Sequence, residues 1–107
     1  MKNISLSFNS EDVKAISCTL SVLPSYDAFD SFPPDLIYMP ANVIRKLTKQ
    51  EQLDQRELYL IAVSVDFAYK ALRGELTIED EALSKLRMYF FTINKLHPSF
   101  SSLLGSE

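Results

Sequence analysis

The stretch from Leu58 to Leu72 constrains the fold most, because its side chains are apolar nearly all round a helix. Thr48 and Glu51 form a capping-box pair, which predicts that this helix begins near residue 48. Gly74 predicts that it ends at about Arg73. A helix that is apolar on all sides usually lies at the centre of a domain. The sequence therefore predicts a helical fold built around this segment.

Two further helices are predicted, one on each side of the central one along the chain. Asn9 or Ser10 can cap a helix that continues to about Pro24, with acids in its first turn and apolar residues at helical spacing. Thr77 opens the last long helix, which Pro98 ends. The short link before it predicts that this helix is an antiparallel neighbour of the central one.

Four of the five prolines lie between residues 24 and 40, so this stretch cannot form one regular helix. A short helix is predicted from Pro40 to Leu47, because proline suits the first helical turn. Residues 3–8 alternate between apolar and polar, which fits a short strand. We therefore expect one mostly α domain over residues 1–107, a bundle of four or five helices with or without this N-terminal β-strand.

Composition excludes several kinds of site. Fourteen acids against eleven basic residues give a net charge of −3, which disfavours a direct nucleic-acid-binding surface. The single Cys18 and the single His97 cannot form a disulfide or a zinc site, and the two glycines form no phosphate-binding loop. We expect no metal and no cofactor. No stretch resembles a signal peptide or a membrane span, so we expect a cytoplasmic protein without a membrane partner.

No residue pattern predicts an active site, and we expect a protein that is not an enzyme. His97 falls just before Pro98, where a histidine commonly bonds the last carbonyls of a helix. A small enzyme that uses Asp66 or Glu81 with His97 is an alternative, and it requires these groups to meet in one pocket. The only tight basic group, at residues 45–49, is interpreted as a solvated helix face. Cys18 is interpreted as a small core thiol.

The segment from Tyr26 to Tyr38 combines acidic and aromatic residues and contains no basic residue. Aromatic side chains supply contact area and carboxylates steer a cationic partner, which are properties of a binding hot spot. The other interpretation is a long connection whose aromatics cover the core and whose aspartates cap helices or turns. The expected partner-binding residues are Tyr26, Asp27, Phe29, Asp30, Phe32, Asp35 and Tyr38.

Within this segment, the string DLIYMP from Asp35 to Pro40 resembles the DLIYYP-like string of the nuclease-colicin immunity proteins. The resemblance implies a small, acidic, helical bacterial protein that binds and neutralises a basic toxin nuclease. It also implies toxin contacts for Asp35 and Tyr38. Met39 stands where the family has a second tyrosine, so that contact is not implied.

The leading hypothesis is therefore a non-catalytic inhibitor, an immunity or antitoxin-like protein that covers the basic active-site cleft of a bacterial toxin, plausibly a nuclease. A standard interface buries about 800 Å² per partner, so neighbouring helix faces must add to the acidic segment. The alternative is a helical structural or assembly module, a homodimer in which a second copy completes the apolar helix from Leu58 to Leu72. An inhibitor can be a monomer, whereas an obligate dimer cannot.

Overall fold

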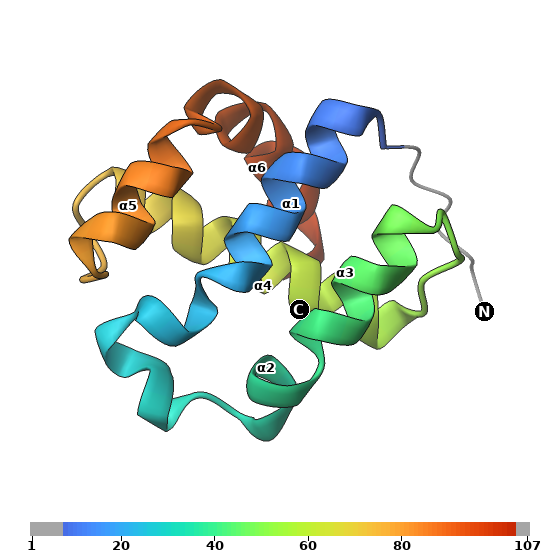
Figure 1. Ribbon diagram of the computed structural model, residues 1–107, viewed down its shortest axis with the longest axis horizontal. Coiled ribbons are helices and arrows are strands. Elements are labelled where there is room, and N and C mark those ends of the chain that lie inside the picture. Colours follow the sequence, from blue (N-terminus) through green and yellow to red (C-terminus); the bar gives the residue numbers. More distant parts are fainter. Residues whose placement is uncertain (1–7, 105–107) are drawn as a thin grey trace.

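The computed structural model describes residues 8–104, which form six α-helices and two short 3-10 helices (Figure 1). In chain order these are α1 (Ser10–Ser21), η1 (Leu23–Ser25), η2 (Asp27–Ser31), α2 (Pro34–Tyr38), α3 (Pro40–Thr48), α4 (Gln55–Leu72), α5 (Asp80–Arg87) and α6 (Phe90–Leu104). The predicted mostly α fold is confirmed. The strand predicted at residues 3–8 lies outside the described residues except for Phe8.

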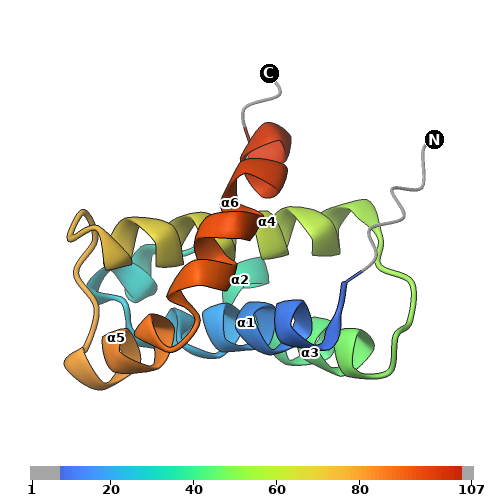
Figure 2. The same cartoon turned by 90° about the horizontal axis from the view of Figure 1, so that it is seen from above.

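Helix α4 is central, as predicted. Figure 2 shows α1, α3 and α5 in one layer and α4 in a second layer, with α6 crossing α4. The radius of gyration is 12.9 Å, which matches the roughly 13 Å of a compact domain of this length. Although α4 has 18 residues, neither it nor another helix in residues 8–104 is long and apolar enough to cross a membrane. Its buried side chains are those of Glu57, Leu58, Leu60, Ile61, Ala62, Ser64, Val65, Ala68 and Ala71.

Two helix ends lie where the capping residues in the sequence predict them. Asn9 caps α1 in a capping box, because its side chain accepts from the Asp12 amide (2.8 Å) while Asp12 accepts from the Asn9 amide (3.3 Å). At the other signal, Gly74 adopts a left-handed conformation (φ 80°) and ends α4. The Glu75 amide then bonds back to the Lys70 carbonyl at 2.8 Å, as in a Schellman motif.

The predicted start of the central helix is wrong. Thr48 is the last residue of α3, and its hydroxyl donates to the Ile44 carbonyl (2.9 Å). Gln50 then takes a left-handed conformation (φ 58°), which stops α3 before another helix can begin. The capping box of α4 is instead formed by Asp54 and Glu57, with amide-to-carboxylate distances of 2.8 and 2.9 Å.

The predicted helix from Thr77 to Pro98 is also wrong in its extent. Thr77 precedes α5, and the chain turns at Met88–Tyr89 before α6 begins. Pro98 lies inside α6, where the burial of Leu96 and Phe100 on either side offsets the hydrogen bond that a proline cannot donate. Because of the turn, α6 crosses α4 and does not run antiparallel beside it (Figure 2).

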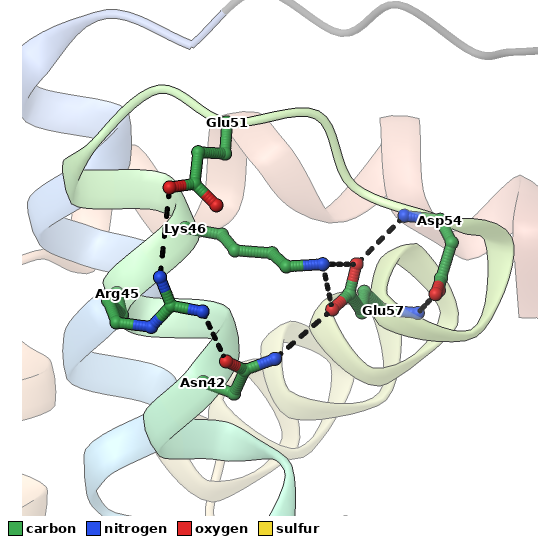
Figure 3. Close-up of polar contacts among 6 residues, drawn as sticks. All are labelled: Asn42, Arg45, Lys46, Glu51, Asp54 and Glu57. Carbon is green, nitrogen blue, oxygen red and sulfur yellow. Dashed lines mark hydrogen bonds and ion pairs between the residues drawn. The ribbon is translucent and has the colours of Figure 1, made fainter.

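A buried carboxylate joins α3 to α4 (Figure 3). Glu57 is only 3% exposed, and both its oxygens lie within 3.0 Å of the Lys46 ammonium. The amides of Asp54 and Asn42 also donate to it, and Arg45 holds Asn42 at 2.7 Å. Hydrogen bonding to Glu57 raises the pKa of Lys46. Lys46 is therefore part of a structural ion pair, which corrects its interpretation as a solvated residue.

Candidate functional site

The acidic segment Tyr26–Tyr38 lies along one edge of the molecule, at the bottom of Figure 1. Its first half is fixed to the link between α4 and α5. The Asp27 amide donates to the Thr77 carbonyl, and the Glu79 amide donates to the Ser25 carbonyl, both at 3.1 Å. Tyr26 and Ile78 form an isolated antiparallel β-bridge between the same two stretches. This contact gives the start of the segment a defined position on the fold.

The aromatic side chains of the segment turn inward onto α4. The Phe67 ring of α4 lies 5.7 Å from the Tyr26 ring and 5.2 Å from the Phe32 ring, measured between centroids. Phe29 packs edge-on against Phe32 at 5.7 Å. Tyr26 is only 4% exposed, while Phe29 and Phe32 are half-buried. These rings therefore cover the core, as the second interpretation of the segment expects.

Two carboxylates of the segment, in contrast, face solvent. Asp27 and Asp30 are both exposed, and η2 has no side-chain cap. Within the described residues neither carboxylate forms an ion pair or accepts a hydrogen bond from a backbone amide, so neither caps a helix or turn as the second interpretation expects. Tyr38 is 79% exposed at the end of α2. Asp35 lies in the backbone of α2, and its side chain is outside the described part of the structure.

A groove of about 690 Å³ separates the acidic segment from α4. One wall is formed by Pro33 and Leu36, and Tyr59 stands at its rim with 56% of its surface exposed. The sequence analysis missed this groove, although the α4 residues recur at helical spacing and could have been recognised as one stripe. They are Gln55, Arg56, Tyr59, Leu60, Val63, Asp66 and Phe67.

A smaller hollow of about 330 Å³ lies on the other side of the segment, against the link between α4 and α5. Its lining combines three aromatic rings with two carboxylates, those of Asp27 and Glu75. Glu75 was not among the expected site residues, since nothing in its local sequence indicates that the following residues pair with η2. The full lining is Tyr26, Asp27, Ala28, Phe32, Phe67, Glu75, Leu76 and Thr77.

The hydroxyl of Tyr26 is buried and has no hydrogen-bond partner among the described residues. Burial raises the pKa of this phenol strongly, and the nearby charges of Cys18 and Asp66 act in the same direction. Cys18 is half-buried in α1, packs against the core as predicted, and has its own pKa raised by burial. The phenol and the thiol are therefore both held in their neutral forms.

Asp66 and His97 are in contact, whereas the enzyme alternative requires them to meet in one pocket, and the groove beside α2 is lined by Asp66 and not by His97. The His97 Nε2 lies 3.0 Å from an Asp66 oxygen, and the second oxygen lies 3.1 Å from the Lys70 ammonium. The His97 ring also stacks on Tyr69 at 3.8 Å. Glu81 is exposed on α5 and has no contact with this cluster. The expected helix-end role of His97 is wrong, because α6 continues past it and the ring ties α6 to α4 instead.

Comparisons with models of protein families, with curated proteins and with solved structures each found no match. A function for this chain is therefore argued from the chemistry of its own surface. In residues 8–104, no three His, Cys, Asp or Glu side chains are grouped so that they could hold a metal ion. The acidic edge, with its groove and hollow, is the candidate site.

Proposed function

We propose that this protein is a non-catalytic inhibitor of the immunity or antitoxin type, which binds a basic toxin domain such as a nuclease and covers its active-site cleft. The observation that carries the proposal is the exposed pair Asp27 and Asp30. The two carboxylates lie in one short 3-10 helix, and within the described residues neither has a cation beside it.

Charge complementarity supports a cationic protein as the partner. The cleft of a nuclease is positively charged because it binds phosphates, and carboxylates at an interface accelerate encounter with such a surface. The acidic residues outside Tyr26–Tyr38 equal the basic residues in number, so the whole formal excess of negative charge lies in this segment. The partner therefore meets its opposite charge at this edge of the fold.

The same edge supplies apolar surface for the contact. Tyr38 and Ile37 project from α2, and Tyr59 rims the groove beside it. Exposed tyrosines provide a large contact area at low entropic cost and are enriched among residues that dominate binding energy. The carboxylates of η2 and the exposed tyrosines of α2 and α4 together approach the composition of a protein-binding surface.

The test begins by looking beside the gene for this chain for a gene that encodes a toxin with a basic domain, and it uses that domain as the purified partner. We expect the purified domain to bind the wild-type protein and to lose nuclease activity in the complex. The double variant Asp27→Lys/Asp30→Lys should weaken binding at least about 100-fold in calorimetry, since it turns attraction into repulsion.

The matched control is Asp80→Lys/Glu81→Lys, which makes the same change of charge on α5. It should bind within about threefold of wild type if only the acidic edge is used. Wild-type affinity in the Asp27/Asp30 variant, with an unchanged helical spectrum, would overturn the proposal. Absence of any binding by the wild-type protein would do the same.

The second candidate function is a homodimeric assembly module. The surface that favours it in the structure is the junction of α5 and α6, and not the apolar helix α4. Most of α4 is covered by the chain's own helices, so α4 does not need a second copy. The junction of α5 and α6 instead exposes Met88 (74%), Phe90 (44%) and Phe91 (85%). An apolar cluster of this kind marks a contact surface. Sedimentation at micromolar and millimolar concentration, with Met88→Ser/Phe91→Ser as the variant, tests whether it joins two copies.

A further inference from the structure

We infer that the hollow between η2 and residues 75–77 binds the guanidinium group of an arginine, and that the basic partner supplies this side chain. The inference rests on the proposed function, because it names the group of the partner that is anchored at the acidic edge. The hollow is distinct from the groove beside α2, which receives apolar surface, and the two linings share only Phe67.

The lining of the hollow has the two components that a guanidinium requires. The half-buried Phe32 and Phe67, whose ring centroids are 5.2 Å apart, supply aromatic surface on which a planar cation can stack, and both pack against the buried Tyr26. Asp27 and Glu75 supply carboxylate oxygens that accept its N–H groups. Glu75 already accepts from Arg73 at 2.8 Å, whereas Asp27 has no ion pair among the described residues. A neutral apolar ligand would leave the Asp27 carboxylate unused, and an anion would be repelled by both carboxylates.

Arginine fits this lining better than lysine does. Its guanidinium is flat, weakly hydrated and able to donate two parallel hydrogen bonds, whereas an ammonium is compact and strongly hydrated. The chain itself shows the same chemistry next to the hollow. Arg73 donates to Glu75 at 2.8 Å and lies over the Tyr69 ring at 5.4 Å, so an arginine here already combines a carboxylate with an aromatic ring.

Size and rigidity also agree with a single side chain as the ligand. The volume of about 330 Å³ is at the lower limit of small-molecule sites, which span roughly 300–1,000 Å³. The two walls are joined by the hydrogen bond from the Asp27 amide to the Thr77 carbonyl and by the bridge between Tyr26 and Ile78. A site whose walls are fixed before binding loses little entropy when it is occupied.

The test titrates the full chain with small probes, so that it does not depend on the identity of the partner. The probes are N-acetyl-arginine methylamide, its lysine counterpart and the citrulline counterpart, which has nearly the shape of arginine but no charge. Binding is followed by amide chemical shifts in nitrogen-15 NMR spectra. We expect saturable shifts at residues 27–28 and 75–77 with arginine, and weaker ones with lysine and citrulline.

Two variants and one control locate the site. Asp27→Asn should weaken arginine binding about three- to tenfold, since one carboxylate is neutralised on an exposed rim. Phe32→Leu keeps the charge and removes a stacking ring, so it should also weaken binding. Asp30→Asn neutralises an exposed acid of the same 3-10 helix that does not line the hollow, and it should bind arginine like wild type.

Equal shifts with citrulline, or wild-type binding by Asp27→Asn, would overturn the inference, and equal binding of lysine would overturn the preference for arginine. The two proposals also fail separately. If arginine does not bind but the neighbouring toxin domain does, the hollow is not the anchor and the inhibitor function stands. If arginine binds and the toxin domain does not, the hollow is a cation site and the proposed function falls.

Discussion

Replacing Tyr26 with phenylalanine is expected to raise the free energy of unfolding by about 1–2 kcal/mol. The Tyr26 hydroxyl is buried and has no hydrogen-bond partner among the described residues. A hydroxyl that leaves water without a new partner costs about 1–3 kcal/mol in protein mutational data. Removing one oxygen leaves a small void, which costs a few tenths of a kcal/mol at about 24 cal/mol per Å³. The stabilising effect therefore exceeds the loss.

The assay is urea unfolding followed by far-UV circular dichroism, because the chain has no tryptophan and the substitution alters tyrosine fluorescence. For a domain of this length the gain corresponds to a rise in Tm of about 4–8 °C per kcal/mol. Tyr38→Phe is the matched control, since that hydroxyl belongs to a side chain that is 79% exposed. It should change stability by less than about 0.5 kcal/mol.

The difference in unfolding free energy between Tyr26→Phe and the wild type is expected to depend on pH. Burial raises the pKa of Tyr26 in the folded protein, so the phenol loses its proton first in the unfolded state, near pH 10. The free energy of unfolding of the wild-type protein is unaffected by this titration below about pH 10. It falls as the pH rises above about 10, because the unfolded state ionises and the folded state does not. At pH 11 the advantage of Tyr26→Phe should therefore be larger by roughly 1.4 kcal/mol. A variant that is less stable than wild type at pH 7 would refute the reasoning, because it would mean that the hydroxyl has a partner.

Three further outcomes are expected from the packing. Asp54→Ala should lower the free energy of unfolding by about 1 kcal/mol, because it removes the cap of α4. Thr48→Ala should lower it by less than half of that. Equal losses in urea unfolding would contradict the assignment of Asp54 as the cap. Cys18 should react with a disulfide reagent at pH 8 more slowly in the folded protein than in urea, since burial raises its pKa and disfavours the thiolate. His97→Ala should lower the free energy of unfolding by about 1–2 kcal/mol, because it removes both the hydrogen bond to Asp66 and the stacking on Tyr69. His97→Phe keeps the stacking and should lower it by less, which thermal unfolding measures.

Local signals predicted the helix boundaries only where no second signal competed with them. The start of α1 was predicted to within one residue, because its two candidate caps, Asn9 and Ser10, are adjacent, and the end of α4 was predicted from Gly74, which is left-handed. The start of α4 was not recognised, since Thr48 with Glu51 and Asp54 with Glu57 both match the capping-box pattern. The choice between them depends on tertiary structure, because Glu57 is buried against Lys46 of α3.

The error at Pro98 has the same origin. Proline normally ends a helix, but here the burial of Leu96 and Phe100 in the core, on either side of it, outweighs the missing hydrogen bond. The turn at Met88–Tyr89 has no proline or glycine to mark it, so periodicity alone joined α5 to α6. Treating them as one helix also concealed the exposed cluster at their junction.

For the candidate site, the sequence singled out the segment Tyr26–Tyr38 but did not show which of its side chains face the core and which face solvent. Acids and aromatics alternate along residues 26–38, and no helical or strand period assigns either to one face. The separation follows from Phe67 of α4, because the rings of Tyr26 and Phe32 pack inward against it while Asp27 and Asp30 are exposed to solvent. Glu75 joins the site only through the bridge between Tyr26 and Ile78, a contact between residues far apart in sequence.

The positions of the acidic groups separate those that stabilise the fold from those that can serve a partner. Asp12 and Glu57 are buried, and each belongs to a capping box and pairs with a lysine. Asp66 binds both Lys70 and the histidine that joins α6 to α4. Asp27 and Asp30 do neither within the described residues, and the 3-10 helix that carries them is too short for an appreciable dipole. Both carboxylates are therefore available to a cation outside the chain, as the proposed function requires, and the arginine titration tests this for Asp27, which lines the hollow.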